Sequence, residues 1–164
     1  MRNALFLIAF AAICAMQPVP VWAQPSVIVV RHGEKRDNSP DPVLSTQGQA
    51  RAKRLANMLA VSSVTAIYTT EYKRTTLLAA PTAKRLGLTP VVIAAKETDA
   101  LLAKIRAHGK DDAVLVVGHS NTVPAILKGL GHLGHVTVTE ADFDNLFIVA
   151  MQPSGAPTVV HLKY

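Results

Sequence analysis

Short apolar runs that alternate with amphipathic segments are the feature that most constrains the fold of this chain. Val27–Val30 ("VIVV") and most of residues 113–119 ("AVLVVGH") are apolar and rich in β-branched side chains, as is typical of buried strands. Residues 45–60 ("STQGQARAKRLANMLA") instead place apolar side chains at helical spacing. Strands separated by helices predict one α/β domain, a mainly parallel sheet with helices on both faces.

The same alternation continues to the end of the chain. It predicts further strands at 64–70, 89–94, 145–151 and 157–164, and further helices at 73–87, 97–109 and 123–131. Pro81 is expected to kink or interrupt the second helix, because proline lacks the N–H that a helix interior needs. The turn at 152–155 ("QPSG") is expected to join the last two strands as a hairpin.

The first 23 residues have the pattern of a signal peptide. Arg2 is followed by the apolar run 4–16, and Val21 and Ala23 have the small-x-small spacing of a cleavage site. Thirteen apolar residues are too few for a membrane anchor, since a spanning helix needs roughly 20. Cys14 raises a lipoprotein alternative, but Ile13 before it fits such a site poorly. We therefore expect residues 24–164 to form the exported domain, periplasmic or secreted.

The amino-acid composition indicates which classes of ligand and partner this domain can bind. Cleavage would remove Arg2, one of 17 Lys and Arg residues, so the formal charge would fall from +6 to +5. It would also remove Cys14, the single cysteine, and leave a domain that is stable through its core alone. The basic balance fits an anionic ligand. Aromatic residues are few and basic residues are spread along the chain, so we expect no nucleic acid partner.

Polar side chains follow three of the predicted strands where each strand ends. Arg31 and His32 follow the first strand, 69–71 ("TTE") end the second, and 118–120 ("GHS") end the strand that begins at Ala113. Ligands of parallel α/β sheets bind at the carboxyl ends of the strands. These residues are therefore expected to share one site.

Four segments, in order, resemble the histidine phosphatase superfamily, which has the phosphoglycerate mutase-like fold. They are residues 31–35 ("RHGEK"), 44–52 ("LSTQGQARA"), 67–81 ("IYTTEYKRTTLLAAP") and 114–123 ("VLVVGHSNTV"). The resemblance covers nearly all of residues 24–164. It implies a phosphomonoester hydrolase in which His32 is the nucleophile and His119 the second histidine of the pocket.

The chemistry of phosphoryl transfer agrees with this assignment. A phosphoryl group needs positive charge around its equatorial oxygens and an in-line nucleophile. Arg31 and Arg74 suit the first role, because guanidinium donors are planar and always charged. A neutral imidazole suits the second role. His119, followed by Ser120 and Asn121 just before a predicted helix, is expected to bind the phosphoryl oxygens with them.

The general acid is left open by the sequence. In many members of the superfamily it follows the third strand, where this chain has Glu97 and Asp99. Glu34 and Glu71 lie inside the motifs and are the other candidates. A surface helix cap is an equal alternative for Glu97. The short members that act on phosphohistidine lack such an acid, because an imidazole leaving group needs less protonation.

We expect no cofactor and no metal. His132 and His135 are the residues that would suggest one, but no cysteine or convergent carboxylate accompanies them. The main hypothesis is therefore a metal-independent phosphatase that acts on a phosphorylated small molecule. A non-catalytic phospho-ligand binding module and a phosphohistidine protein phosphatase are the alternatives. The natural substrate and the oligomeric state are not determined by the sequence.

Overall fold

The fold is described from a computed structural model of the chain, which covers residues 25–152 and 154–164. The predicted signal peptide and its cleavage site lie outside the described residues. The elements follow one another in the order β1 (Ser26–Arg31), α1 (Thr46–Met58), β2 (Val64–Thr69), α2 (Lys73–Leu86), β3 (Val91–Val92), α3 (Thr98–Arg106), β4 (Ala113–Gly118), α4 (Thr122–Gly129), β5 (Asn145–Ala150) and β6 (Thr158–Lys163).

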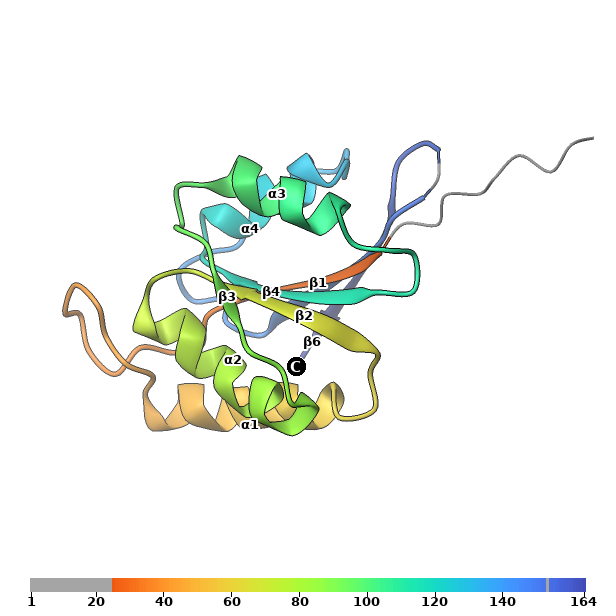
Figure 1. Cartoon of the computed structure of the whole chain (residues 1–164). Helices are drawn as coiled ribbons and strands as arrows, with labels where there is room; N and C mark the ends of the chain where they lie inside the picture. The colour runs from red at the N-terminus through yellow and green to blue at the C-terminus, as the bar shows by residue number, and fades with distance from the viewer. Residues whose placement is uncertain (1–24, 153) are drawn as a thin grey trace, which may run out of the picture.

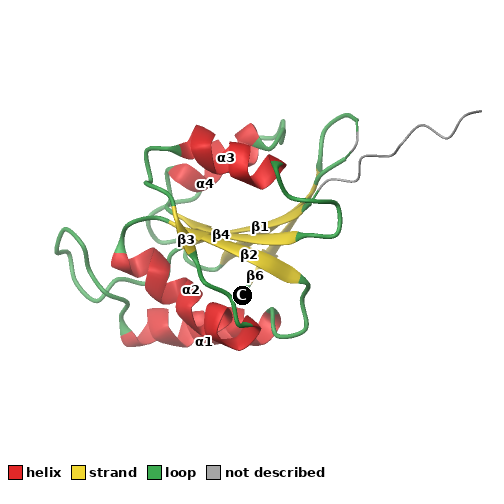
Figure 2. Cartoon of the chain, viewed as in Figure 1, coloured by secondary structure: helices red, strands yellow, loops and turns green. Residues whose placement is uncertain are grey.

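One six-stranded sheet, in the order β3-β2-β4-β1-β5-β6, forms the centre of the molecule. The strands β1, β2, β3 and β4 run parallel, whereas β5 and β6 are antiparallel additions at one side. Helices α1 and α2 cover one face of the sheet and α3 and α4 cover the other (Figures 1 and 2). The predicted α/β class, with a mainly parallel sheet and helices on both faces, is confirmed.

Two apolar clusters hold these layers together, one on each face of the sheet. Alternate residues of β1 point to opposite faces, so Val27 and Val29 pack under α3 and α4, whereas Ile28 and Val30 pack over α1 and α2. The central strand β4 contributes to both clusters in the same way and is buried along its whole length. The pattern agrees with the continuous apolar runs in the sequence.

Two of the sequence-based expectations need correction, the length of one strand and an interruption of the second helix at Pro81. The strand predicted at 89–94 is reduced to Val91–Val92, both exposed at the edge of the sheet. Helix α2 does not stop at Pro81 but continues to Leu86 and ends at Gly87, which has the left-handed φ of 67°. A proline at this position leaves the carbonyl of Leu77 without its helical partner. Leu77 is 40% exposed, so it lies on the solvent side of α2.

The last two strands form the hairpin that the sequence predicts, with Asn145 opposite Lys163 and Ala150 opposite Thr158.

No helix within 25–152 or 154–164 is long and apolar enough to cross a membrane.

Glycines allow the loop after β1 to lie against the start of α1. The N-cap Ser45 accepts a hydrogen bond from the backbone N–H of Gly48, and its own N–H donates to the carbonyl of Glu34 at 2.9 Å. A Cβ atom on Gly48 would lie 2.5 Å from the Glu34 carbonyl oxygen. The glycine in the "LSTQG" motif is therefore needed for a close approach of two backbones that also fixes the segment following His32.

We expect Gly48→Ala to lower the free energy of unfolding by about 1–3 kcal/mol, because the backbone of Glu34 has to move to admit a methyl group. Gly109→Ala is the control. A Cβ atom there would lie 3.6 Å from Asp112, in ordinary contact, and the expected change is within about 0.5 kcal/mol. Urea denaturation measures both, and equal stability of the two variants would contradict the close-approach argument.

Candidate active site

His32 lies at the carboxyl end of β1 and is 4% exposed. Its backbone N–H donates to the carbonyl of Gly118 at 2.9 Å, which continues the pairing of β1 with β4 by one residue. The Nδ1 atom is 2.8 Å from the carbonyl oxygen of Gly33. Since a carbonyl can only accept, Nδ1 carries the proton and Nε2 retains its lone pair. This tautomer is the one that a nucleophilic Nε2 requires.

His119 occupies the equivalent position after β4 and is 6% exposed. Its Nε2 is 2.9 Å from the hydroxyl of Thr70, which is itself 2.9 Å from the hydroxyl of Thr75. Thr75 is 2.8 Å from the carbonyl of Tyr72, which can only accept. Each hydroxyl proton is used when His119 Nε2–H donates to Thr70, Thr70 to Thr75 and Thr75 to the carbonyl. The chain of threonines therefore leaves Nδ1 of His119 for another partner.

The two imidazole rings lie edge to face, with centroids 5.3 Å apart. Burial, with a further contribution from Arg31, lowers the pKa of His32 to about 3. Burial and the positive charge of Arg74 lower the pKa of His119 to about 4. Both rings are thus neutral near pH 7. A phosphoryl dianion beside His119 would favour its protonated form, because an opposite charge stabilises an imidazolium.

Arg31 is held from one side by residues 139–143. Its Nη1 donates to the carbonyl of Thr139 at 2.6 Å, its Nη2 donates to the carboxylate of Glu140 at 2.7 Å, and its guanidinium lies 4.3 Å from the ring centre of Phe143. The side chain has no exposed surface. Its buried Nε–H has no acceptor within the described residues. Arg31 is therefore a fixed, buried positive charge next to His32.

Arg74 lies in the first turn of α2, on the other side of the histidines. Its guanidinium lies 4.2 Å from the ring centre of Tyr72, and the same ring packs edge-on against His119. The buried Nε–H of Arg74 has no acceptor among the residues that the structure describes. A cation that is stacked but not paired with a carboxylate leaves its N–H groups for an anionic ligand.

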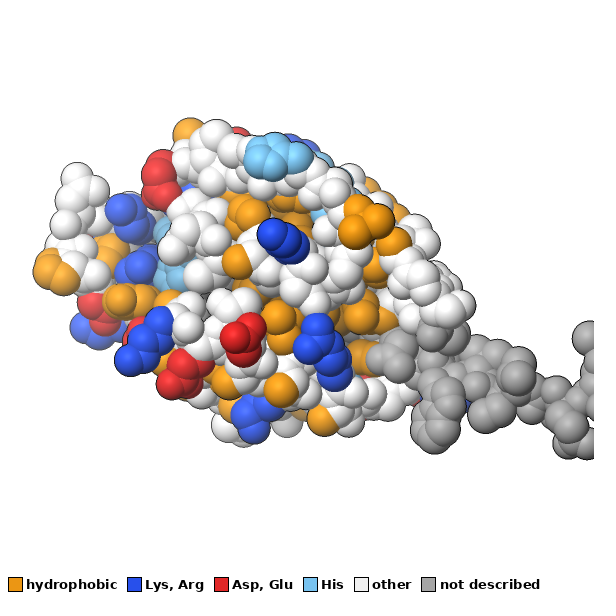
Figure 3. Space-filling view, turned by 90° about the horizontal axis from the view of Figure 1, so that it is seen from above, with side chains coloured by type: hydrophobic (Ala, Val, Ile, Leu, Met, Phe, Trp, Pro, Cys, Tyr) orange, Lys and Arg blue, Asp and Glu red, His pale blue; other side chains and the backbone are white. Residues whose placement is uncertain are grey.

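A pocket of about 390 Å³ opens over these groups. It is lined by Tyr72, Arg74, Ala95, His119, Ser120, Asn121 and Glu140. Four residues predicted from the sequence, Arg74, His119, Ser120 and Asn121, therefore share one cavity, with Arg31 and His32 buried beside it. Charged side chains of both signs crowd the corresponding end of the molecule, at the left in Figure 3, with histidine between them.

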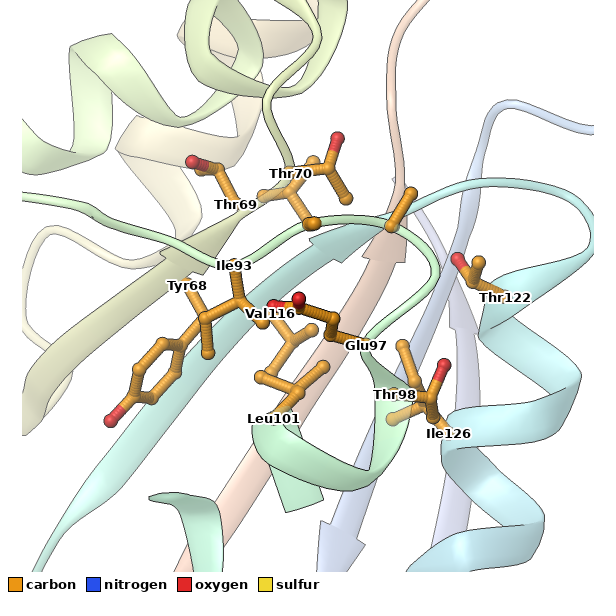
Figure 4. Close-up of a pocket in the computed structure, with 14 residues that line it drawn as sticks. Tyr68, Thr69, Thr70, Ile93, Glu97, Thr98, Leu101, Val116, Thr122 and Ile126 are labelled. Carbon is orange, nitrogen blue, oxygen red and sulfur yellow. The ribbon is translucent and has the colours of Figure 1, made fainter. Parts of the chain in front are cut away.

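The structure places Glu97 in a second, adjoining pocket. Glu97 is the N-cap residue of α3 without a side-chain capping bond, and its side chain points toward Ile93 and Val116 in this pocket (Figure 4). This cavity has a volume of about 20 Å³, enough for one water molecule. The two pockets meet at Ala95. Glu97 is thus not brought among Arg74, His119 and Ser120, and its role as a general acid stays a prediction.

The remaining acid candidates are occupied elsewhere or lie on the surface. Glu34 forms an ion pair with Arg51 at 2.6 Å, away from the pocket, and Arg51 also donates to the carbonyl of Tyr164. Glu71 accepts a hydrogen bond from the backbone N–H of Ala95 at 2.8 Å. Asp99 is exposed in the first turn of α3.

The sequence did not indicate three residues that build the site. They are Tyr72, which lies between Arg74 and His119, and Glu140 and Phe143, which contact Arg31. Thr70 was expected at this sheet edge because it ends a predicted strand, but its hydrogen bond with His119 was not foreseen. Glu140 and Phe143 lie in a loop without periodicity and are 109 or more residues from Arg31, so no local pattern indicates them.

Within the described ranges, no group of three or more His, Cys, Asp or Glu side chains is arranged to hold a metal ion. His132 and His135 line a different open pocket, together with Lys128 and Leu133.

The buried neutral histidines predict a stability that falls with acid. Between pH 7 and 5 the unfolded chain binds protons at these positions, whereas the folded protein, with pKa values of about 3 and 4, does not. The free energy of unfolding should therefore decrease by about 1–2 kcal/mol for each histidine. Urea denaturation at the two pH values should show a loss that is roughly halved in His32→Gln.

His135→Gln is the control for this measurement, because His135 is exposed. Its stability should fall between pH 7 and 5 as much as that of the wild type. An identical fall in His32→Gln would contradict a neutral buried imidazole.

Comparison with known proteins agrees with this geometry. The sequence model of the histidine phosphatase superfamily (branch 1) matches residues 27–96. No curated protein sequence matches the chain. Among solved structures, mycobacterial hydrolase 1 is similar with a TM-score of 0.66 and 13% identity, over 82% of this chain and 96% of that protein.

Two further solved structures are phosphatases by name. The protein histidine phosphatase SixA, complexed with tungstate, has a TM-score of 0.65 and 18% identity, over 84% of this chain and 96% of SixA. The mycobacterial glucosyl-3-phosphoglycerate phosphatase has a TM-score of 0.64 and 15% identity, over 85% of this chain and 98% of that protein. At these identities the likeness establishes the fold. The family match over residues 27–96 agrees with this fold, so the chain is similar to the histidine phosphatase superfamily in the sequence of that segment and in its overall fold.

Proposed function

We propose that the protein is a phosphomonoester hydrolase that works through a phosphohistidine at His32. The observation that carries the proposal is the hydrogen bond from His32 Nδ1 to the Gly33 carbonyl, which leaves Nε2 as the free lone pair of a neutral ring. Arg31 and Arg74 lie close enough to lower the pKa of this ring by their charge. A nucleophile between two cations matches the needs of phosphoryl transfer.

The reaction has two displacements at phosphorus. First, a bond forms from His32 Nε2 to phosphorus while the ester P–O bond breaks, and the leaving oxygen takes a proton from an acid at the site or from solvent. Then a water oxygen bonds to phosphorus and gives up a proton to the base so formed or to solvent, the P–N bond breaks, and His32 returns to its neutral form with the proton still on Nδ1. Arg31, Arg74 and His119 hold the equatorial oxygens, and Ser120 and Asn121 lie beside them in the pocket.

A phosphohistidine protein phosphatase is the second candidate. It is supported by the shared fold with SixA over 96% of the length of that protein. The substrate would then be a phosphorylated imidazole on another protein, in place of a phosphorylated small molecule. Hydrolysis of a phosphohistidine peptide in preference to aryl and alkyl phosphates would favour this candidate.

The proposal includes export of residues 24–164 after removal of the signal peptide. Its support is the charge, the apolar run and the "VWA" spacing of residues 1–23. N-terminal sequencing of the protein recovered from outside the cytoplasm tests it.

We expect the protein to hydrolyse an aryl phosphate, and to keep this activity in EDTA, because arginines supply the positive charge that a metal would otherwise provide. The release of the aryl alcohol measures both. A phospho-ligand binding module would instead bind phosphate without turnover. Loss of activity in EDTA with recovery on added zinc would contradict metal independence and would direct attention to His132 and His135.

Arg74→Lys should reduce kcat/KM by the equivalent of about 2–4 kcal/mol, since a point charge cannot replace a planar guanidinium stacked on Tyr72. Lys73→Ala is the neighbouring control. Lys73 is exposed and lies 3.7 Å from Asp41, so it should keep nearly normal activity. Equal losses at the two positions would mean that diffuse basic charge, and not a placed guanidinium, attracts the substrate.

A further inference from the structure

Glu140 is the carboxylate that lines the pocket together with Arg74 and His119. One of its oxygens accepts from Arg31 Nη2 at 2.7 Å and the other accepts from the hydroxyl of Ser120. It thus bridges the ends of β1 and β4. The Ser120 hydroxyl, together with the charge of Arg31, keeps the pKa of Glu140 below its usual value in the free protein.

The position of Glu140 relative to His32 follows from burial. The side chain of Glu140 is 74% exposed, whereas Arg31 has no exposed surface and His32 is 4% exposed. His32 therefore lies on the inner side of the site and Glu140 at its mouth. In an in-line displacement the leaving oxygen departs on the side opposite to the attacking Nε2. That side is the mouth, where the carboxylate is.

Arg31 does not depend on Glu140 for its position. Its Nη1 donates to the Thr139 carbonyl, and Phe143 packs on its face. The backbone of this loop is fixed separately, because Asp142 accepts from both the N–H and the hydroxyl of Thr139. Phosphoryl oxygens can therefore replace the Glu140 carboxylate on Arg31 while Ser120 keeps it nearby. A carboxylate that loses a cationic partner and gains an anionic neighbour takes up a proton more readily.

We propose that Glu140, and not Glu97, is the carboxyl group that exchanges a proton with the leaving group and with the attacking water. The assignment rests on the proposed function. Glu140 takes up a proton as the substrate binds. When the ester P–O bond breaks, that proton passes to the leaving oxygen. When the water oxygen bonds to phosphorus and the P–N bond breaks, the water proton returns to Glu140.

The dependence on the leaving group tests this proposal. An alkyl alcohol needs a proton to leave, whereas a nitrophenol does not, so kcat/KM of Glu140→Gln should fall about 100-fold on an alkyl phosphate and by less than about threefold on nitrophenyl phosphate. In Glu140→Gln, the hydrolysis of phosphohistidine lacks the carboxylate that accepts the water proton, whichever substrate was used. Phosphohistidine should therefore accumulate in Glu140→Gln during turnover of nitrophenyl phosphate, which a merely structural defect would not produce.

Two further variants complete the experiment. Asp144→Asn makes the same change in charge in the same loop, but Asp144 pairs with Lys163 at 2.7 Å, so normal kinetics on both substrates are expected. Glu97→Gln tests the rival residue, and a loss confined to the alkyl phosphate in this variant would overturn the proposal. Equal losses or equal gains on both substrates in Glu140→Gln would also overturn it, and gains would identify Glu140 as a competitor for the phosphoryl site.

The outcome for wild type separates this proposal from the proposed function. If the wild type hydrolyses nitrophenyl phosphate and Glu140→Gln shows no dependence on the leaving group, only the role of Glu140 is wrong. If the wild type hydrolyses neither ester, the proposed function fails, and the role of Glu140 fails with it.

Discussion

The parallel pairing of β1 with β4 is the interaction on which the site depends. Arg31 is opposite Gly118 in this register, so the next residue of each strand is a histidine. Two imidazoles that are 87 positions apart in the sequence thereby meet with ring centres 5.3 Å apart. A shift of one residue would turn each side chain toward the opposite face of the sheet. The apolar clusters on both faces of β1 and β4 therefore fix the candidate active site as well as the fold.

Burial gives these residues their chemistry. A histidine in water is partly protonated near pH 7, but the surroundings of His32 and His119 keep both rings neutral. The same apolar surroundings would make unpaired cations costly, and Arg31 is compensated by a carbonyl, a carboxylate and an aromatic ring. The loop at 139–143 thus supports the proposed phosphoryl site from a part of the chain that lies outside the four segments resembling the superfamily.

The sequence predicts the fold class and the site residues that follow the strands, but it does not predict the site residues that lie in the loop before β5. The α/β class, the sheet edge and the pair His32 and His119 follow from apolar runs that end in polar residues, because strand ends have a fixed place in such sheets. Pro81 does not interrupt α2, because the carbonyl that it leaves without a helical partner belongs to Leu77, on the solvent side of the helix. No local pattern indicates that Glu140 belongs to the site, because its contacts with Arg31 and Ser120 form only when distant segments pack together.

A covalent phosphoryl group on His32 is the central claim of this account. The most direct measurement is to mix the protein with nitrophenyl phosphate, quench with alkali, in which phosphohistidine is stable, and locate the modified residue by mass spectrometry. The account predicts an acid-labile phosphoryl group on His32 that is absent from His32→Ala. A phosphoryl group on another residue, or normal turnover by His32→Ala, would contradict it.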